Sequence, residues 1–403
     1  MEESVVVLDY GSHTIKAGYA LSFPSDSEPR IVKPSLVEIG STGAASQPPT
    51  AKQTAVVSQG RIQEHDQFEA ILHQILYQDL AWQQGTEGSI VVAEPLFTSR
   101  HDRELIAQLL FEVFNVSGMY VQDQAVLSLY SLGRTSGLVV DIGHGKCDIG
   151  TVTEGLLNSS STRRIPTAGA ALTSLLQQQL CSHHLSTQNA QHLKEQCASA
   201  CESSEEYDVL AAAASHTQPT HNTSSAAHPD TGASTSANQN SASHPSATSP
   251  TPPHTYILPD GHAIDVSPSI AASLGEALFR PTPSQQHTPD SGYGVAYAAC
   301  DAVSSLGDFA SRRACFDGIV LCGGSSLIKG VAARFLRDLR TLAPPSTSPA
   351  YVPVPDYLQA EHTARYASWI GGSVIAKVLA QQNQYVTKAD YEEHGPAAVR
   401  RCT

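Results

Sequence analysis

Hydrophobic residues recur at helical spacing in two stretches of the first third of the chain. The first apolar face begins near Asp66 and Glu69, which have the spacing of a capping box, and consists of Phe68, Ile71, Leu72, Ile75, Leu76 and Leu80. The second follows Ser99, an expected N-cap, and consists of Leu105, Ile106, Leu109, Leu110 and Val113. Both patterns predict amphipathic helices packed on a core.

Other hydrophobic residues form short, β-branched-rich runs that end at polar residues or glycine. These runs lie at residues 5–8, 90–92, 138–140 and 319–321. Such runs are typical of strands buried on both faces in parallel or mixed sheets. Strands that alternate with amphipathic helices predict an α/β fold.

Two stretches lack any such pattern. Residues 211–254 consist almost entirely of Ala, Ser, Thr, Pro, His, Asn and Gln, and Asp230 is their only charged residue. Because this segment has too little apolar surface to offset the entropy of ordering, it is predicted to be a disordered insertion in a surface loop. The shorter stretch at 40–49 is rich in Gly, Ala, Ser and Pro and predicts a loop.

Composition narrows the class of protein. With 403 residues, 41% of them hydrophobic, the chain can form a large core, which we expect to be divided between two lobes. The balance of 24 Lys and Arg against 38 Asp and Glu gives a net charge of −14, which disfavours direct binding to bare nucleic acid. With no run of about 18 apolar residues and no leader pattern, we expect a soluble intracellular protein with no membrane span. The eight cysteines have no regular spacing and are expected to be reduced thiols.

The most informative pattern is a strand that ends in Asp-x-Gly and occurs twice. Asp9 precedes Gly11 and Gly18, and Asp141 precedes Gly143 and Gly150 at the same spacings, 132 residues later. One such turn alone would be an ordinary tight turn. Its repetition predicts two related hairpins, one in each lobe.

This arrangement suits a nucleotide held between the hairpins. Backbone N–H groups in glycine-containing turns form a concavity for phosphate oxygens. Asp9 and Asp141 are expected to hold Mg²⁺ through water, because Mg²⁺ keeps most of its waters and takes few carboxylates. Lys16 is expected to reach the phosphates, the alternative being a solvated lysine at a strand end. A third element, IVLCGGSSLIKG at 319–330, has a Gly323-Gly324 turn that would let a flat base or ribose approach the backbone.

Together these three elements resemble the superfamily of actin, heat-shock-70 proteins and hexokinase, whose fold closes two lobes around a nucleotide. Longer stretches are similar to the actin branch, namely NVSGMYVQDQAVLSLYSLGRTSGLVVDIGHG from Asn115, YASWIGGSVIAKV from Tyr366 and VTKADYEEHGP from Val386. The resemblance covers nearly all of the chain except 211–254 and 36–58. Within that branch, DIGHGKCDIG and EPLFTSRHDRELIAQLLFEVFNVSG resemble the plant-type nuclear actin-related proteins.

The resemblance implies a division into domains. Residues 1–131 and 367–403 would form an outer lobe, with a reduced second subdomain at about 35–57. Residues 132–366 would form an inner lobe that contains the insertion.

The resemblance also implies roles for single residues. It places the two phosphate loops at Gly11, Ser12 and Lys16 and at Asp141, Gly143 and Gly145. It places the adenosine beside Lys194, Glu195, Gly323, Gly324, Ser325, Ser326 and Arg365, although Lys194 and Glu195 could instead form an exposed helix face. Gln124 matches the residue that positions the attacking water.

Three positions depart from the actin pattern. His13 stands where actins have a second glycine in the first loop, and His144 stands where they have an acidic residue in the second. Asp148 replaces a histidine that helps to arrange water. Because phosphoryl transfer depends on positioning and charge, these changes should weaken hydrolysis more than binding.

The leading functional hypothesis is a nuclear, non-catalytic subunit of a chromatin-remodelling or chromatin-modifying complex, found in the nucleus with some in the cytoplasm. ATP or ADP with Mg²⁺ would be its structural ligand. An amphipathic helix of a partner would dock in a groove lined by Tyr130, Gly133, Thr135, Ile375 and Val378, unless Ile375 and Val378 are plain helix core. The alternatives are an active Mg-ATPase and a cytoskeletal filament protein. The latter is disfavoured because the segment after Ser35 lacks a long apolar loop for contact with a neighbouring subunit.

Overall fold

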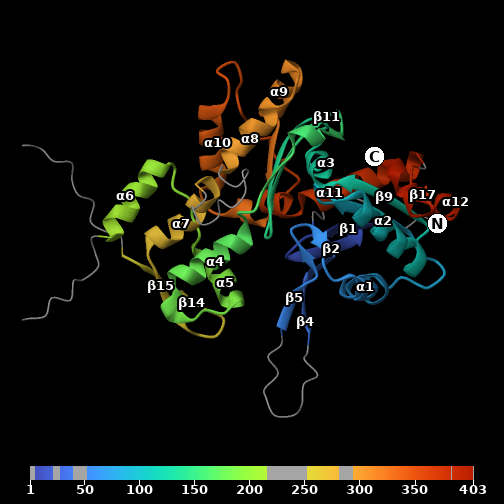
Figure 1. Cartoon of the computed structure of the whole chain (residues 1–403), viewed down its shortest axis with the longest axis horizontal. Coiled ribbons are helices and arrows are strands. Elements are labelled where there is room, and N and C mark those ends of the chain that lie inside the picture. The colour runs from blue at the N-terminus through green and yellow to red at the C-terminus, as the bar shows by residue number, and fades with distance from the viewer. Residues whose placement is uncertain are drawn as a thin grey trace, which may run out of the picture.

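The chain forms two main β-sheets with helices packed around them, with β1 and β9 towards the right of Figure 1 and α4–α7 towards the left. The computed structural model describes residues 5–20, 28–39, 52–215, 252–280, 294–382 and 384–402. Within these ranges no helix is both long and apolar enough to cross a bilayer.

The first sheet has six strands in the order β17-β9-β8-β1-β2-β3. Their bounds are Val6–Tyr10 for β1, Thr14–Tyr19 for β2, Ile31–Pro34 for β3, Ser89–Glu94 for β8, Gly118–Asp123 for β9 and Val386–Thr387 for β17. The helices beside this sheet are α1 (His65–His73), α2 (Arg100–Gln108) and α12 (Lys388–His394). α1 continues as a π-helical turn at Gln74–Asp79, and α2 does so at Leu109–Val113. α12 is followed by a 3₁₀ segment, Gly395–Cys402. Beside this sheet lie two small hairpins, β4 (Leu36–Ile39) with β5 (Lys52–Ala55) and β6 (Val57–Ser58) with β7 (Arg61–Ile62).

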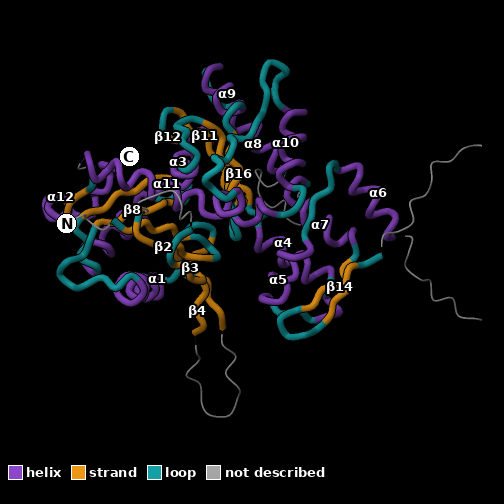
Figure 2. Tube along the Cα trace, turned by 180° about the vertical axis from the view of Figure 1, so that it is seen from behind, coloured by secondary structure: helices purple, strands orange, loops and turns teal. Residues whose placement is uncertain are grey.

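The second sheet has the order β12-β11-β10-β16, with β13 paired to β11. Its strands are β10 (Gly137–Ile142), β11 (Cys147–Thr153), β12 (Leu156–Leu157), β13 (Arg163–Ile165) and β16 (Ile319–Cys322). Around it lie α8 (Val295–Ser304), α9 (Phe309–Phe316) and α10 (Val331–Leu342). A separate group, at the side of Figure 2 away from the first sheet, contains α4 (Gly169–Gln179), α5 (Thr187–Cys197), α6 (Ser204–Ser215), α7 (Pro268–Phe279) and the hairpin of β14 (His254–Ile257) with β15 (Ala263–Val266).

The two predicted hairpins have the same strand pairing. β1 pairs antiparallel with β2 and parallel with β8, while β10 pairs antiparallel with β11 and parallel with β16. Asp9 lies opposite Lys16 in the first hairpin, and Asp141 lies opposite Asp148 in the second. The four apolar runs fall in strands of these sheets, except that Val5 precedes β1 by one residue. This placement confirms the predicted duplication and the α/β class.

The helix predictions hold in part. Ser99 caps α2, because its Oγ accepts from the backbone N–H of Asp102 at 3.1 Å. The capping box at Asp66 is wrong. α1 begins at His65, so Glu64 and not Asp66 occupies the cap position, and no side chain caps the helix there.

The predicted insertion needs a correction at both edges. Residues 211–215 complete α6, and His254 begins β14. The rest of the insertion, 216–251, and the loop at 40–49 lie outside the described residues.

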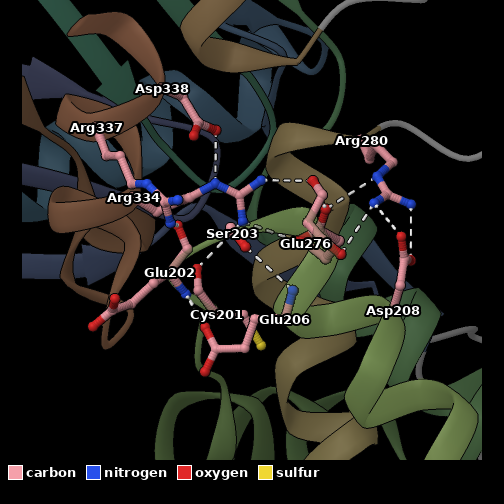
Figure 3. Close-up of polar contacts among 11 residues, drawn as sticks. Cys201, Glu202, Ser203, Glu206, Asp208, Glu276, Arg280, Arg334, Arg337 and Asp338 are labelled. Atoms are coloured by element: carbon pink, nitrogen blue, oxygen red, sulfur yellow. Dashed lines mark hydrogen bonds and ion pairs between the residues drawn. The ribbon is translucent and has the colours of Figure 1, made fainter. Parts of the chain in front are cut away.

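Polar contacts hold the first half of α6 against neighbouring helices, just before the low-complexity stretch begins (Figure 3). Arg334 of α10 is 3% exposed and bonds Glu276 of α7 at 3.3 Å and the hydroxyl of Ser204 at 2.7 Å. Arg280, at the end of α7, forms an ion pair with Asp208 of α6 at 3.0 Å. The guanidinium groups therefore fix α6 to α7 and α10.

The apolar core is distributed over both sheets. One large buried cluster comes from residues 6–121 and 386–402, and another from residues 138–343. A smaller cluster between them includes Leu129, Val139, Val320 and Ala367. The domain boundaries given by the family resemblance stay a prediction.

The two lobes are joined through a helix pair. α3 (Gln124–Tyr130) lies against α11 (Ala360–Gln382), which is kinked at Tyr366. The contact is close because Gly371 has no side chain. A Cβ placed there would lie 1.7 Å from the carbonyl oxygen of Leu127.

We therefore predict that Gly371→Ala pushes α11 away from α3. Overpacking of a tight contact costs about 1–3 kcal/mol, and the clash with a backbone oxygen places this variant at the upper end. Chemical denaturation should show that loss in the free energy of unfolding. Gly307→Ala is the matched control, because a Cβ at Gly307 meets nothing within 4 Å. Equal stability of the two variants would contradict the close packing.

Candidate nucleotide-binding cleft

A cavity of about 1110 Å³ lies between the turns of the two hairpins. It is lined by nearly all the residues predicted to contact nucleotide, water or metal: Asp9, Gly11, Ser12, Lys16, Gln124, Asp141, Gly143, Gly145, Lys194, Glu195, Gly323, Gly324, Ser325 and Arg365. Ser326 is the exception. It lines a smaller apolar hollow of about 310 Å³, and its hydroxyl donates to the carbonyl of Gly323 at 2.7 Å.

The first hairpin presents a carboxylate that is already bonded to three side chains. Asp9 is 1% exposed and accepts from Lys16 Nζ at 2.8 Å and from Gln124 Nε2 at 2.7 Å. The Ser368 hydroxyl donates to the same carboxylate at 2.8 Å. The amide predicted to position water therefore bonds Asp9 in this structure.

The second hairpin presents two carboxylates in cross-strand register. Arg164 forms two bonds to Asp148, at 2.6 and 2.8 Å, and Lys146 also pairs with Asp148. Asp141 makes no side-chain hydrogen bond to the described residues. Burial raises its pKa to about 6, and the nearby Lys146 opposes that rise.

Two imidazoles meet across the cleft where the actin pattern has a glycine and a carboxylate. The rings of His13 and His144 lie 4.8 Å apart between centroids. The Gln191 amide nitrogen is 3.1 Å from a Glu195 oxygen and 3.0 Å from His13 Nε2, so we assign it as donor to both. His13 Nδ1 then carries the proton, and it is buried without a partner among the described residues.

Backbone amides in both turns remain free for an anion. Gly11 and Gly143 close their turns by donating to Thr14 and Lys146 at 3.0 Å. The next two N–H groups of each turn make no hydrogen bond within the described ranges: those of Ser12, His13, His144 and Gly145. Such successive amides form the concavity that suits phosphate.

The third element borders the same cavity, as predicted. Gly323 has φ +88°, and a Cβ there would lie 2.3 Å from a carboxylate oxygen of Asp141, so only glycine is accommodated. Ser325 donates to the carbonyl of Gly143 at 2.9 Å and so ties this turn to the second hairpin. The side chain of Lys194 is also held in place, because its ammonium donates to the carbonyl of Gly169 at 3.0 Å.

The lining fits a nucleotide better than it fits a divalent cation. The volume and the free turn amides match an anionic ligand. The expected magnesium ligands are less available, because Asp9 is bonded by three side chains. The Mg²⁺ site at Asp9 and Asp141 stays a prediction.

Three residues of the cleft, Lys146, Gln191 and Ser368, were missed by the sequence reasoning, as was Arg164, which bonds Asp148. Lys146 had a usable signal, because it lies directly before β11 and only two residues from the opposite charge of Asp148. Gln191 and Ser368 had none, since they contact hairpin residues distant in sequence.

The buried imidazoles generate a prediction about pH. Burial lowers the pKa of His144 to about 4, and the neighbouring His13 and Lys194 add to the shift. As pH falls, the unfolded chain therefore binds this proton before the folded chain does. The contribution of the neutral imidazole to the free energy of unfolding is complete above pH ~6.5 and is lost as pH falls towards ~4. At pH 5 the loss from this group is on the order of 2 kcal/mol.

Denaturation of the wild type and of His144→Gln at pH 7.5 and pH 5 checks this. The variant should lose less stability on acidification by about that amount. An equal loss in both proteins would mean that the imidazole is not held in its neutral form.

Comparison with known proteins agrees with this geometry. A model of the actin family matches residues 1–403. Actin-related protein 7 of Oryza sativa subsp. indica is 34% identical to this chain over 404 residues, 98% of each chain. Actin-related protein 7 of Arabidopsis thaliana is 34% identical over 409 residues, again 98% of each. The predicted actin-type fold and the resemblance to plant actin-related proteins are confirmed: the chain belongs to the actin family.

Proposed function

We propose that this chain is a nuclear, non-catalytic, nucleotide-binding subunit of a chromatin-remodelling or chromatin-modifying complex. The observation that carries the proposal is the contrast within the cleft. Nearly all the residues expected to contact a nucleotide line the cavity, while His13 and His144 meet where the family has a glycine and a carboxylate. The resemblance to nuclear actin-related proteins supports the location and the kind of complex.

Binding without turnover follows from the chemistry of the cleft. Free turn amides and Lys16 can hold phosphate oxygens as a static ligand set. Hydrolysis needs in addition an ordered water and a group that directs it. Gln124 is bonded to Asp9, and at His144 a neutral ring replaces the family's carboxylate.

We predict that the wild type binds ATP without measurable turnover, and that His13→Gly combined with His144→Asp raises hydrolysis. Each native histidine is expected to add roughly 2–4 kcal/mol to the barrier, by analogy with other electrostatic groups. A single-turnover assay with radiolabelled ATP measures this on both proteins. Turnover by the wild type at the rate of a competent ATPase would refute the non-catalytic part of the proposal.

The partner surface that we propose lies where α3 and α11 run side by side. Gly133 follows α3, and the backbone N–H of Gly155 donates to the carbonyl of Thr135 at 2.7 Å, with Tyr130 close to Gly155. On α11, Val378 is 40% exposed, so it is available to a partner.

The structure changes the choice of test residues on α11. Ile375 packs partly against the buried cluster around Trp369, so the core alternative applies to it. Val374 is 47% exposed and lies one turn before Val378 on the same helix face. These two valines form an apolar pair suited to an amphipathic helix.

Val374→Asp combined with Val378→Asp should therefore abolish copurification of the complex from nuclei, because it places charge in an apolar contact. The variant should keep the melting temperature of the wild type within a few degrees. Val209→Asp is the matched control, since Val209 is 67% exposed on α6, outside this groove. Normal copurification of the double variant would remove this surface from the proposal.

A further inference from the structure

The carboxylates at the turns of the two hairpins are balanced by cations without any metal ion. Asp9, Asp141 and Asp148 carry the three carboxylates, and Lys16, Lys146 and Arg164 carry three cations that pair with or face them, although Asp148 and Arg164 are not part of the cavity lining. The two imidazoles add no charge at neutral pH, because burial lowers the pKa of both His13 and His144. The sum over these six side chains is zero, so the two hairpins supply no excess of negative charge for a divalent cation, and only the phosphates of the nucleotide could supply it.

Two of the three carboxylates are also occupied by protein partners, and only Asp141 makes no side-chain hydrogen bond to the described residues. Lys16, Gln124 and Ser368 bond Asp9, and Arg164 and Lys146 bond Asp148. Mg²⁺ requires near-octahedral oxygen ligands and several ordered waters. To coordinate it directly, Asp9 and Asp148 would have to give up bonds to these partners. Among the described residues no group of three or more His, Cys, Asp or Glu is placed to hold a metal ion.

Lys146 occupies the position that matters most for this balance. It is 7% exposed, lines the cavity and packs against Gly60, where an added Cβ would lie 3.0 Å from Lys146 Cε. Its ammonium pairs with Asp148 and is near enough to Asp141 to oppose the protonation of that carboxyl group. A buried ammonium thus lies beside the two carboxylates of the second hairpin, much as Lys16 lies beside Asp9.

We propose that the cleft binds the phosphates of its nucleotide without a divalent cation, and that the ammonium of Lys146, together with that of Lys16, supplies the countercharge. This inference rests on the proposed nucleotide binding. An ammonium has three N–H donors and one positive charge, so it can bond a phosphate oxygen and a protein carboxylate at the same time. The turn amides complete the ligand set.

The test is titration of the full-length protein with ATP and with ADP, once in excess EDTA and once in millimolar Mg²⁺. The wild type should bind with the same Kd in both buffers, within about threefold. Lys146→Met should bind about tenfold or more weakly in EDTA, because a charge-assisted contact is lost. Mg²⁺ should restore most of that affinity, because it can replace the positive charge that the variant has lost beside Asp141 and Asp148. Lys146→Arg should keep binding in EDTA, and Lys388→Met, on α12, should behave as the wild type.

Melting temperatures of each variant show whether the fold is kept, and Lys146→Gln replaces Lys146→Met if the latter unfolds. Wild-type binding that is tenfold or more tighter in Mg²⁺ than in EDTA would overturn the inference while leaving the proposed function intact. Unchanged binding by a folded Lys146→Met in EDTA would also overturn it. An absence of binding in both buffers would refute the proposed function, and the inference with it.

Discussion

The buried carboxylate of Asp9 joins the parts of the molecule on which the cleft depends. It lies at the end of β1 and accepts from Lys16 on β2, Gln124 at the start of α3 and Ser368 on α11. A buried carboxylate is tolerated only when its oxygens are satisfied, so these elements must keep their mutual positions. The same helices pack closely at Gly371, which fixes the first sheet relative to the second. The cavity is the space left between the hairpins that this arrangement holds apart.

Much of this could be predicted from the sequence because the information is local. The two Asp-x-Gly strand ends and the apolar runs each lie within a few residues, and the structure places them in equivalent hairpins. The capping box at Asp66 failed because two acidic residues at the right spacing do not determine where a helix begins. The edge of the insertion was misplaced because a hydrogen bond from Arg334 to Ser204 and an ion pair of Arg280 with Asp208 hold the first turns of α6, and the helix continues into residues that composition alone indicated to be disordered.

The sequence predicted most of the residues that line the cleft, but not how their charged groups pair. Spacing shows that Asp9, Asp141 and Gly323 can meet, but not which charges will pair when they do. The pairing of Asp148 with Arg164 and Lys146, and the meeting of His13 with His144, depend on how the strands and lobes come together. These contacts turn a general nucleotide fold into one whose cleft is electrically balanced and whose water-directing groups are committed elsewhere. Under the proposed function, binding and hydrolysis would therefore be separable properties of this site.

The central claim is that the cleft holds a nucleotide as a lasting part of the fold. Native mass spectrometry of the protein purified from nuclei under non-denaturing conditions measures this directly, because it reads the mass of everything that stays bound. The account predicts one adenine nucleotide per chain, still present and chemically unchanged after prolonged incubation. A chain that carries no nucleotide, and gains none when ATP is added, would contradict it.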